Sequence, residues 1–405
     1  MRSPLRVTVV LSTSSGGVGA HVRSVVDRLP ALGVRPHVVA PAATGQSFGF
    51  ADMAARGESD GGVGFTPVEI FTRPRPRHDF EAIRQLRAVV RGVDDAGDSG
   101  DGGERPGGVP RPDVVHAHGF RAAALVGLAL GRRRHGRTPL VATWHNALLG
   151  SAPRRAVLSG LERLAARRAD VTLGASADLV QRARVLGAPD ARLAPVAAPA
   201  TGAPQRTRDE VRAELGAGDR PVVLAVGRLA PQKDYDTLLA AASHWALREP
   251  RPLLVIAGDG PDLGRLRRAA EDARVDVRFL GRRDDVADLL AAADVYAITS
   301  RWEARALVVQ EAMLAGVPVV CTAVGGLPEL VGDDAMLVPV GSPEAVAGAV
   351  EALLDDPARG RELAERGRQR ARQWPDEDET ARQLAEIYAE LARIPLTPPR
   401  QARWP

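Results

Sequence analysis

Short apolar runs rich in β-branched residues alternate with amphipathic segments along almost the whole chain. In the first half such runs occur at Leu5–Leu11 and Pro36–Ala40, with a segment of helical periodicity, Gly19–Leu29, between them. This alternation is typical of a parallel β-sheet covered by helices on both faces. It begins again at Val222–Val226, after a segment of linker composition at Ala197–Pro204. Because 405 residues are too many for one compact core, the sequence predicts an α/β protein with two doubly wound, Rossmann-like domains.

We expect residues 1–200 to form the first domain and residues 205–375 the second. Residues 376–405 predict a C-terminal helix that packs back on the first domain, followed by a Pro-rich tail. Ligands of doubly wound sheets bind at the carboxyl ends of the strands, so two such domains predict a site in a central cleft between facing edges.

Two segments interrupt the alternation in the first domain. Ala42–Gly64 and Val93–Pro112 are rich in Gly, Asp, Ser and Pro and contain few groups able to bury. Such composition predicts mobile surface insertions.

Composition excludes several classes of protein. The net charge is only +4, aromatic residues make up 4% of the chain, and arginine is spread along it rather than gathered in one block. This pattern predicts no nucleic-acid partner. Cys321 is the only cysteine, so a disulfide within the chain and a cysteine metal cluster are both excluded.

The start of the chain predicts a compartment. The apolar run Leu5–Leu11 is too short for the core of a secretory signal and predicts a first strand. No apolar run approaches the ~20 residues that span a bilayer. We therefore expect a cytoplasmic protein.

Lys233 is the only lysine among 54 basic residues. It lies in the run Gly227–Lys233, directly after the first strand of the second domain, together with Arg228. Two cations at the carboxyl end of a strand can hold a diphosphate and neutralise charge on a leaving nucleotide. A solvated loop is the alternative, and the survival of one lysine in a chain that otherwise uses arginine favours the functional interpretation.

The run Ser14–His21 follows the first strand, opens a helix and contains Gly16 and Gly17. Glycines in this position let backbone amides approach a phosphate at a helix N-terminus. If the dinucleotide-binding motif G-x-G-x-x-G is read from Gly17, Val22 stands where the third glycine is required. No acidic residue follows about 20 positions later, so a nicotinamide site is not expected. A tight turn that needs glycine for steric reasons is an alternative that stays open.

Two carboxylates follow the strand predicted at Val295–Ile298. Glu303 is expected in the loop and Glu311 in the second turn of the next helix, among apolar neighbours. A carboxylate in such surroundings needs hydrogen-bond donors, and ligand hydroxyls are suitable ones. A glycosidase also uses two carboxylates, and their separation cannot be read from the sequence.

These motifs together resemble the retaining GT-B-fold glycosyltransferases of family 4, over nearly the whole chain. The specific signal is the E-x7-E pair Glu303 and Glu311 behind Arg228 and Lys233. The supporting segments are Gly258–Pro261, Phe279–Gly281, Gly325–Glu329, Asp113–His118 and Thr143–Asn146.

The resemblance implies a role for each matching residue. Arg228 and Lys233 would bind the donor diphosphate, Glu311 the ribose hydroxyls, and Glu303 the hydroxyls of the transferred sugar. Gly16 and Gly17 would approach the donor phosphate, and Arg282 would lie near the base. The expected catalytic residues are His118, Arg228, Lys233 and Glu303, and the expected donor-binding residues are Gly16, Gly17, Arg228, Lys233, Arg282, Glu303, Ala304, Arg305, Ala306, Leu307 and Glu311.

The loop after Glu303 departs from the family pattern. The family usually has Gly-Phe-Gly where this chain has Ala304-Arg305-Ala306. Alanine narrows the backbone options and adds methyl groups near the sugar. We hypothesise an altered sugar pocket, with Arg305 either facing an anionic group of donor or acceptor or pointing to solvent.

His118 would lie beside the reacting sugar. His116 and His118 share one face of a strand because the side-chain period is two. One of them can be a packed histidine, and we favour His118 as the site residue.

The resemblance implies transfer with retention of configuration from a nucleoside-diphosphate sugar to an unidentified hydroxyl acceptor, which could be a glycolipid, a glycan or a small metabolite. No metal and no cofactor other than the nucleotide-sugar co-substrate are expected. A sugar-nucleotide epimerase and a catalytically silent GT-B binding module remain as alternatives.

Arginines in the first domain raise the question of membrane contact. They are Arg132, Arg133, Arg134, Arg154, Arg155, Arg163, Arg167 and Arg168. A helix that carries such residues can rest on an anionic membrane at its inner face. A solvated arginine-rich face is the alternative and stays open.

Overall fold

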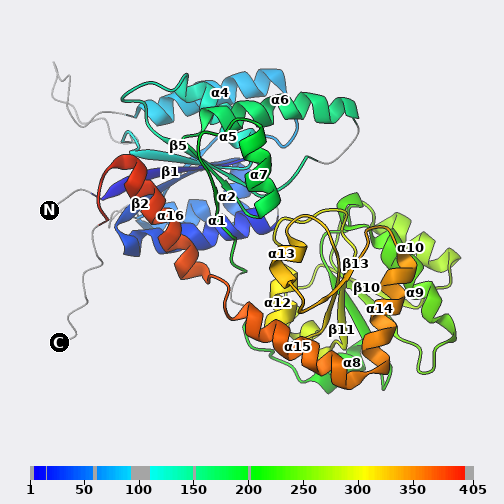
Figure 1. Cartoon of the computed structure of the whole chain (residues 1–405). Coiled ribbons are helices and arrows are strands. Elements are labelled where there is room, and N and C mark those ends of the chain that lie inside the picture. Colours follow the sequence, from blue (N-terminus) through cyan, green and yellow to red (C-terminus); the bar gives the residue numbers. More distant parts are fainter. Residues whose placement is uncertain are drawn as a thin grey trace, which may run out of the picture. The chain divides into compact units, whose positions relative to one another are not determined.

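A computed structural model describes residues 4–14, 16–57, 62–92, 110–148, 152–198 and 202–396, without the side chains of residues 57 and 152–157. The chain divides into two compact units (Figure 1). The first contains Met1–Ala197 and Pro375–Pro405, and the second contains Ala198–Trp374. Each unit is built on one parallel sheet, as the alternation of apolar runs and helical segments predicts.

The first unit has a seven-stranded parallel sheet in the order β3-β2-β1-β4-β5-β6-β7. Strand order reverses between β1 and β4, which are direct neighbours, and this is the point where doubly wound sheets bind ligands. The strands are β1 (Leu5–Leu11), β2 (Val34–Ala40), β3 (Gly64–Pro67), β4 (Val114–His118), β5 (Leu140–Trp144), β6 (Val171–Gly174) and β7 (Ala191–Leu193).

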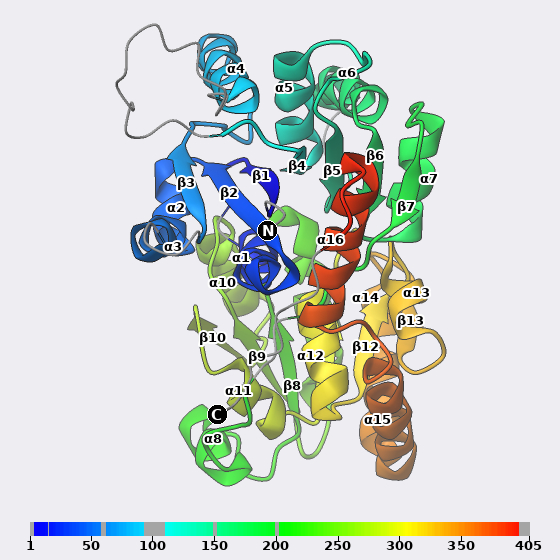
Figure 2. The ribbon, with the colours of Figure 1, turned by 90° about the vertical axis from the view of Figure 1, so that its left-hand side faces the viewer.

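Helices cover both faces of this sheet (Figures 1 and 2). On one face α4 packs against α5 and α5 against α6, and on the other α1 packs against α16. The helices are α1 (Gly17–Arg28), α2 (Ala42–Ser47), α3 (Phe50–Gly57), α4 (Pro76–Arg91), α5 (Phe120–Leu130), α6 (Ala152–Arg168), α7 (Ala177–Val185) and α16 (Glu377–Ala392), with a 3-10 turn η1 at Leu29–Leu32.

The C-terminal helix α16 belongs to the first unit although its sequence follows the second. Asp376 and Glu379 form a capping box that starts it. Its buried face, which includes Leu384, Ile387 and Tyr388, joins the apolar core beneath β1 and α1. The last helix therefore completes a core that the N-terminal residues begin.

The expectation of a surface insertion with few groups able to bury at Ala42–Gly64 is wrong. The segment forms α2 and α3, and it buries Phe50 completely and Met53 largely. Phe65 would clash with any Cβ at Gly45, so the small residues here allow close packing. The average composition of the segment hid these apolar anchors. Residues 93–109 of the other expected insertion lie outside the described residues.

The second unit has a six-stranded parallel sheet in the order β10-β9-β8-β11-β12-β13, which reverses between β8 and β11. One apolar core lies under α8, α11, α12 and α13, and another under α9, α10 and α14. The strands are β8 (Val222–Val226), β9 (Leu253–Ala257), β10 (Val277–Gly281), β11 (Val295–Ile298), β12 (Val319–Thr322) and β13 (Met336–Val338). The helices are α8 (Arg208–Leu215), α9 (Tyr235–Ser243), α10 (Leu263–Asp272), α11 (Val286–Ala292), α12 (Leu307–Ala315), α13 (Leu327–Val331), α14 (Pro343–Asp355) and α15 (Pro357–Ala371), with 3-10 turns η2 (Pro231–Lys233) and η3 (His244–Leu247).

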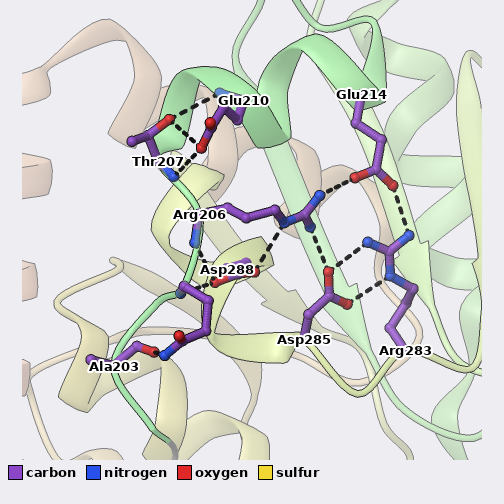
Figure 3. A network of polar contacts seen from close by, with 9 residues as sticks. Ala203, Arg206, Thr207, Glu210, Glu214, Arg283, Asp285 and Asp288 are labelled. Carbon is purple, nitrogen blue, oxygen red and sulfur yellow. Dashed lines mark hydrogen bonds and ion pairs between the residues drawn. The ribbon is translucent and has the colours of Figure 1, made fainter.

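An ionic network ties the segment before α8 to α8 and α11 (Figure 3). Arg206 donates from Nε to Asp288 at 3.0 Å and from Nη2 to Asp285 at 2.5 Å, and it also pairs with Glu214. Arg283 binds the same Asp285 and Glu214, at 2.6 and 2.8 Å. Each arginine thus bridges two elements, and the chain after the linker is fixed against α8 and α11.

Candidate functional site

The loops that carry Arg228, Lys233 and Glu303 lie at the switch point of the second unit, whereas Arg282 follows β10 at the edge of the sheet. The loop Gly227–Lys233 leaves the carboxyl end of β8, and the loop Thr299–Glu303 leaves the carboxyl end of β11, the adjacent strand. A backbone hydrogen bond from Arg301 N to Gln232 O, 2.8 Å long, joins the two loops. The Gln232 side chain adds a second link to Trp302 O, also at 2.8 Å.

Lys233 and Glu303 form an ion pair in this place. Lys233 Nζ lies 2.7 Å from Glu303 Oε1, and the Ser300 hydroxyl donates to the same oxygen at 2.6 Å. The Glu303 side chain is only 10% exposed and that of Lys233 is 23% exposed. A carboxylate this buried needs its partners, because an unpaired charge away from water is costly. The only lysine of the chain therefore faces one of the two predicted carboxylates.

Asp234 orients the lysine loop. Its backbone is left-handed, with φ 49°, which is uncommon for a residue other than glycine. Thr299 donates to Asp234 O at 3.0 Å, and Thr237 donates to its carboxylate at 3.0 Å. Such conformations persist where the surroundings fix them and occur often at functional sites.

Glycines of the family motifs allow close approach of the loops around this pair. A Cβ on Gly258 would lie 1.9 Å from Gly227 O, and Gly258 has φ +143°. A Cβ on Gly325, at φ +54°, would lie 2.0 Å from Glu303 O. Gly326 N donates to that same oxygen at 2.8 Å. The glycines hold the Arg/Lys loop and the Glu303 loop in position, and this is a steric reason for their presence.

Glu311 lies in the second turn of α12, where the apolar pattern predicts it. Its side chain is half-buried and makes no hydrogen bond or ion pair with the residues that the structure describes. Burial raises its pKa from 4.5 to about 7. A carboxylate left without donors at a switch point is well placed to accept hydrogen bonds from a bound ligand.

The Ala304–Ala306 loop is packed inward. Ala304 and Ala306 are buried, and Leu307, half-buried, begins α12. Arg305 does not point to solvent, which excludes one of the two expectations for it. Its guanidinium lies over the Trp374 ring, 5.2 Å from the centroid, and its Nε and Nη2 are buried without a hydrogen-bond partner in the described part of the chain. Burial lowers the Arg305 pKa to about 10.

Two predicted donor residues are exposed. Arg228 lies at the surface after β8 and has no ion pair with a described residue. The Arg282 side chain is 84% exposed and lies 3.6 Å from the Asp284 carboxylate. Neither is fixed by packing, so both can reorient toward a bound nucleotide.

In the first unit, Gly16 and Gly17 begin α1 at the carboxyl end of β1. Gly16 is the N-cap and Gly17 the first helical residue. A Cβ on Gly16 would meet nothing within 4 Å, so packing does not explain this glycine. Gly19 does have a steric reason, because a Cβ there would lie 2.1 Å from the Phe48 ring. Open space over a helix N-terminus is consistent with the expected approach of a phosphate.

His118 ends β4, next to this helix, and lies in a group of four buried histidines. Its ring stacks on His145 with 5.3 Å between centroids, and its Nδ1 lies 3.0 Å from His145 Nε2. The His116 ring lies 4.1 Å from that of His118, and His21 of α1 contacts both His118 and His145 edge-on. Strand β4, the residue that follows β5, and helix α1 thus bring their histidines together.

His116 is the packed member of the pair, as the alternative for one of the two histidines allows. Its Nδ1 lies 2.5 Å from the Tyr388 hydroxyl of α16, and its Nε2 lies 2.6 Å from Thr143 Oγ1. His118 keeps Nε2 without a partner among the described residues. The free nitrogen makes His118 the member able to bind a ligand.

Burial sets the charge state of this group. It lowers the pKa of His21 to about 4 and that of His116 to about 3, and it holds the pKa of His118 and His145 well below the usual value. All four are neutral near pH 7, so they can donate or accept hydrogen bonds without adding charge. No group of three or more His, Cys, Asp or Glu within the described ranges is arranged to hold a metal ion.

His21 and His145 are not among the predicted site residues. Both stand in segments that carry the sequence motifs, Ser14–His21 and Thr143–Asn146, each at the carboxyl end of a strand. Parallel strands bring their carboxyl ends to one edge, so the recurrence of histidine after β1, β4 and β5 is the signal that points to them.

Comparison with known proteins gives the class. Residues 207–374 match the family model for glycosyl transferases group 1, and residues 16–199 match that for the glycosyl transferase 4-like domain. The chain is 33% identical to the D-inositol 3-phosphate glycosyltransferase of Kineococcus radiotolerans over 64% of this chain and 67% of that protein. It is 27% identical to the N-acetyl-alpha-D-glucosaminyl L-malate synthase of Bacillus anthracis over 69% of this chain and 75% of that protein.

Solved structures show the same fold. The chain resembles sucrose-phosphate synthase from Thermosynechococcus elongatus with a TM-score of 0.72 and 22% identity, over 96% of this chain and 99% of the other. It resembles Anabaena HepE in complex with UDP-glucose with a TM-score of 0.71 and 19% identity, over 95% and 100%. The fold is therefore GT-B.

The chain belongs to the group 1 glycosyltransferases of family 4. It is a glycosyltransferase of GT-B fold, as the E-x7-E motif behind Arg228 and Lys233 predicts. None of the helices in the described ranges combines the length and the apolarity needed to cross a bilayer.

Proposed function

We propose that this glycosyltransferase moves a sugar from a nucleoside-diphosphate sugar to a hydroxyl acceptor with retention of anomeric configuration and without a metal ion. The observation that carries the proposal is the switch point of the second unit. There Lys233 and Glu303 form a pair, and Glu311 offers a carboxylate without a partner. The cation can bind a diphosphate, and the two carboxylates can accept hydrogen bonds from the hydroxyls of a sugar and of a ribose.

In the proposed reaction the donor side supplies charge stabilisation. Lys233 and Arg228 bind the diphosphate and stabilise the charge that develops on it as the glycosidic bond breaks. Glu303 accepts hydrogen bonds from hydroxyls of the transferred sugar, and Glu311 accepts them from the ribose. The pairing of Lys233 with Glu303 fixes the two groups relative to each other, so that diphosphate and sugar are held by one connected unit.

The acceptor side supplies positioning. His118, neutral near pH 7, offers its free Nε2 to the reacting sugar or to the attacking hydroxyl. The α1 N-terminus at Gly16 and Gly17 presents backbone amides to a donor phosphate. The acceptor hydroxyl attacks the anomeric carbon on the face from which the nucleoside diphosphate leaves, so the configuration is retained. As the bond to the diphosphate breaks, the proton of the hydroxyl passes to the departing diphosphate oxygen.

The relatives support this class of reaction and leave the donor base open. One, from Mycolicibacterium smegmatis, is named a GDP-mannose-dependent alpha-(1-6)-phosphatidylinositol monomannoside mannosyltransferase and is 37% identical over 40% of this chain and 46% of that protein. HepE is seen with UDP-glucose. A nucleotide-sugar donor is common to both, so we propose one here.

Location and membrane contact belong to the same proposal. We infer a cytoplasmic enzyme. Its exposed arginines would make the contact with the inner face of an anionic membrane. Arg132, Arg134, Arg163 and Arg167 are exposed, whereas Arg133 pairs with Asp170 at 3.0 Å. The side chains of Arg154 and Arg155 lie outside the described residues.

The test is transfer itself. The full-length enzyme is incubated with a panel of UDP-, GDP- and ADP-sugars and of hydroxyl acceptors, and products are found by mass spectrometry. NMR coupling constants then give the anomeric configuration of the product. An α-linked product from an α-linked donor, formed also in EDTA, supports the proposal, and an inverted product contradicts it.

The main alternative is separated in the same experiment. A sugar-nucleotide epimerase would convert the donor to its epimer without any acceptor. Conversion of donor that is independent of acceptor would therefore replace the transferase proposal, and binding of donors with neither reaction would indicate the silent GT-B module.

A further inference from the structure

Three exposed arginines stand close together in the sequence of the first unit, two in the segment before α4 and one in its first turn. They are Arg73, Arg75 and Arg77, separated by Pro74 and Pro76. Their side chains form no hydrogen bond or ion pair with any residue that the structure describes. Other arginines of this unit, such as Arg121 and Arg137, are paired with carboxylates. Three guanidinium groups in this short segment, the arginine loop (residues 70–77, which include the first turn of α4), therefore keep their donors available.

The loop is fixed at the carboxyl edge of the sheet. Thr13, at the end of β1, donates to Ile70 O from its backbone N at 2.8 Å and from its hydroxyl at 3.2 Å. Arg121, which is 4% exposed, donates to Phe71 O and pairs with Asp79 of α4. Neither anchor is itself a predicted site residue, but each stands close in the sequence to one, Thr13 to Gly16 and Arg121 to His118.

These anchors place the arginine loop beside the predicted reacting groups of this unit. Thr13 leads into the Gly16 loop, and Arg121 follows His118 by three residues, at the start of α5. The arginine loop is therefore held at Ile70 by the residues after β1 and at Phe71 by the helix that follows His118. Arg121 also leaves Nη1 buried without a partner among the described residues, so one of its hydrogen-bond donors is unsatisfied.

An aromatic ring holds one of the three arginines. The Arg75 guanidinium lies over the Phe71 ring, 4.1 Å from its centroid, and His78 packs against the same ring edge-on at 5.2 Å. Cation–π contact orients a guanidinium while its N–H groups stay free. The two prolines restrict the backbone on either side of Arg75. The loop is thus preordered to present cations rather than a random solvated segment.

We propose that Arg73, Arg75 and Arg77 bind a phosphate group carried by the acceptor. The inference rests on the proposed function and adds the substrate class, a phosphorylated hydroxyl compound. Guanidinium forks match phosphate oxygens in bidentate geometry. A phosphate bound here holds the acceptor at the edge where His118 ends β4. The phosphate belongs either to a soluble compound or to a phospholipid headgroup.

The first arm of the test uses inorganic phosphate on the full chain. Binding is followed by thermal shift at constant ionic strength, with chloride as the balancing anion. We expect the Arg75→Ala/Arg77→Ala variant to bind phosphate at least about tenfold more weakly than the wild type. Arg35→Ala, which removes an exposed arginine at the opposite, amino end of the sheet, is the matched control and should bind phosphate as the wild type does.

The second arm separates the two sources of phosphate. Flotation is measured with vesicles of phosphatidylglycerol and with vesicles of phosphatidylcholine. Flotation with phosphatidylglycerol that is lost in the double variant and kept in Arg35→Ala assigns the site to a lipid headgroup. Phosphate binding without flotation assigns it to a soluble acceptor.

The proposal is overturned if the double variant binds phosphate as the wild type does, or if the wild type binds neither phosphate nor anionic vesicles. Nucleotide-sugar binding, measured by calorimetry on the same proteins, should be unchanged by the double substitution. Failure of the wild type to bind any nucleotide sugar contradicts the proposed function, while the phosphate result is read independently of it.

Discussion

Replacing Glu311 by glutamine is expected to stabilise the folded protein above neutral pH and to leave it unchanged in acid. Burial raises the Glu311 pKa from 4.5 to about 7. Below pH 4.5 the carboxyl is protonated in the folded and the unfolded chain, so it costs nothing. As the pH rises to about 7 the unfolded chain ionises first, and the folded state loses stability by linkage.

The size of the effect follows from the difference between the Glu311 pKa in the unfolded and in the folded chain. One pKa unit corresponds to about 1.4 kcal/mol, so the full shift amounts to roughly 3 kcal/mol, and partial exposure of the side chain reduces it to about 2 kcal/mol. For a unit of this size that is a rise in Tm of roughly 4–8 °C. Glutamine keeps the shape and removes the charge.

The assay is differential scanning calorimetry of wild type and Glu311→Gln at about pH 4, below the unfolded-state pKa, and at about pH 8. Glu271→Gln, an exposed glutamate of α10, is the matched control and should change Tm at neither pH. The reasoning is wrong if Glu311→Gln has the Tm of the wild type at about pH 8, or if its gain is the same at both pH values.

Three other predictions concern single contacts. Lys233→Met should lower the free energy of unfolding, measured in urea, by roughly 3 kcal/mol, because it leaves Glu303 buried without its cation. The double variant with Glu303→Gln should regain most of that free energy. Tyr388→Phe should cost about 1–2 kcal/mol in the same assay, since it leaves His116 Nδ1 unbonded; an unchanged midpoint would show that this contact is absent. The Arg283 hydrogen bond lowers the Asp285 pKa from 3.8, so Asp285→Asn should lose about 1 kcal/mol at pH 7 and progressively less as acid protonates the wild-type carboxyl.

Much of the fold could be predicted because periodicity and composition are local properties. Parallel strands that are buried on both faces occur in the sequence as continuous apolar runs. The runs at Leu5–Leu11 and Val222–Val226 form β1 and β8. Residues that follow parallel strands lie at the carboxyl edge of the sheet. Lys233 follows β8 and Glu303 follows β11, so the sequence places both at that edge.

The rest depends on contacts that no local pattern contains. The Lys233–Glu303 pair joins residues 70 positions apart, and the Tyr388–His116 hydrogen bond spans 272. The sequence leaves two expectations for Arg305, and its packing over the Trp374 ring excludes solvent while contact with a ligand stays a prediction. The Phe50 anchor of α3 was hidden in a segment whose average composition is polar.

Calorimetric binding of UDP-, GDP- and ADP-sugars to wild type and Lys233→Met tests the central claim most directly. Arg267→Ala, which removes an exposed cation of α10, serves as the control for net charge. The proposed site predicts that one nucleotide class binds the wild type and Arg267→Ala equally, and that folded Lys233→Met binds it at least about tenfold more weakly. Equal binding by Lys233→Met, or no binding of any nucleotide sugar by the wild type, would contradict the donor site at Lys233 and Glu303.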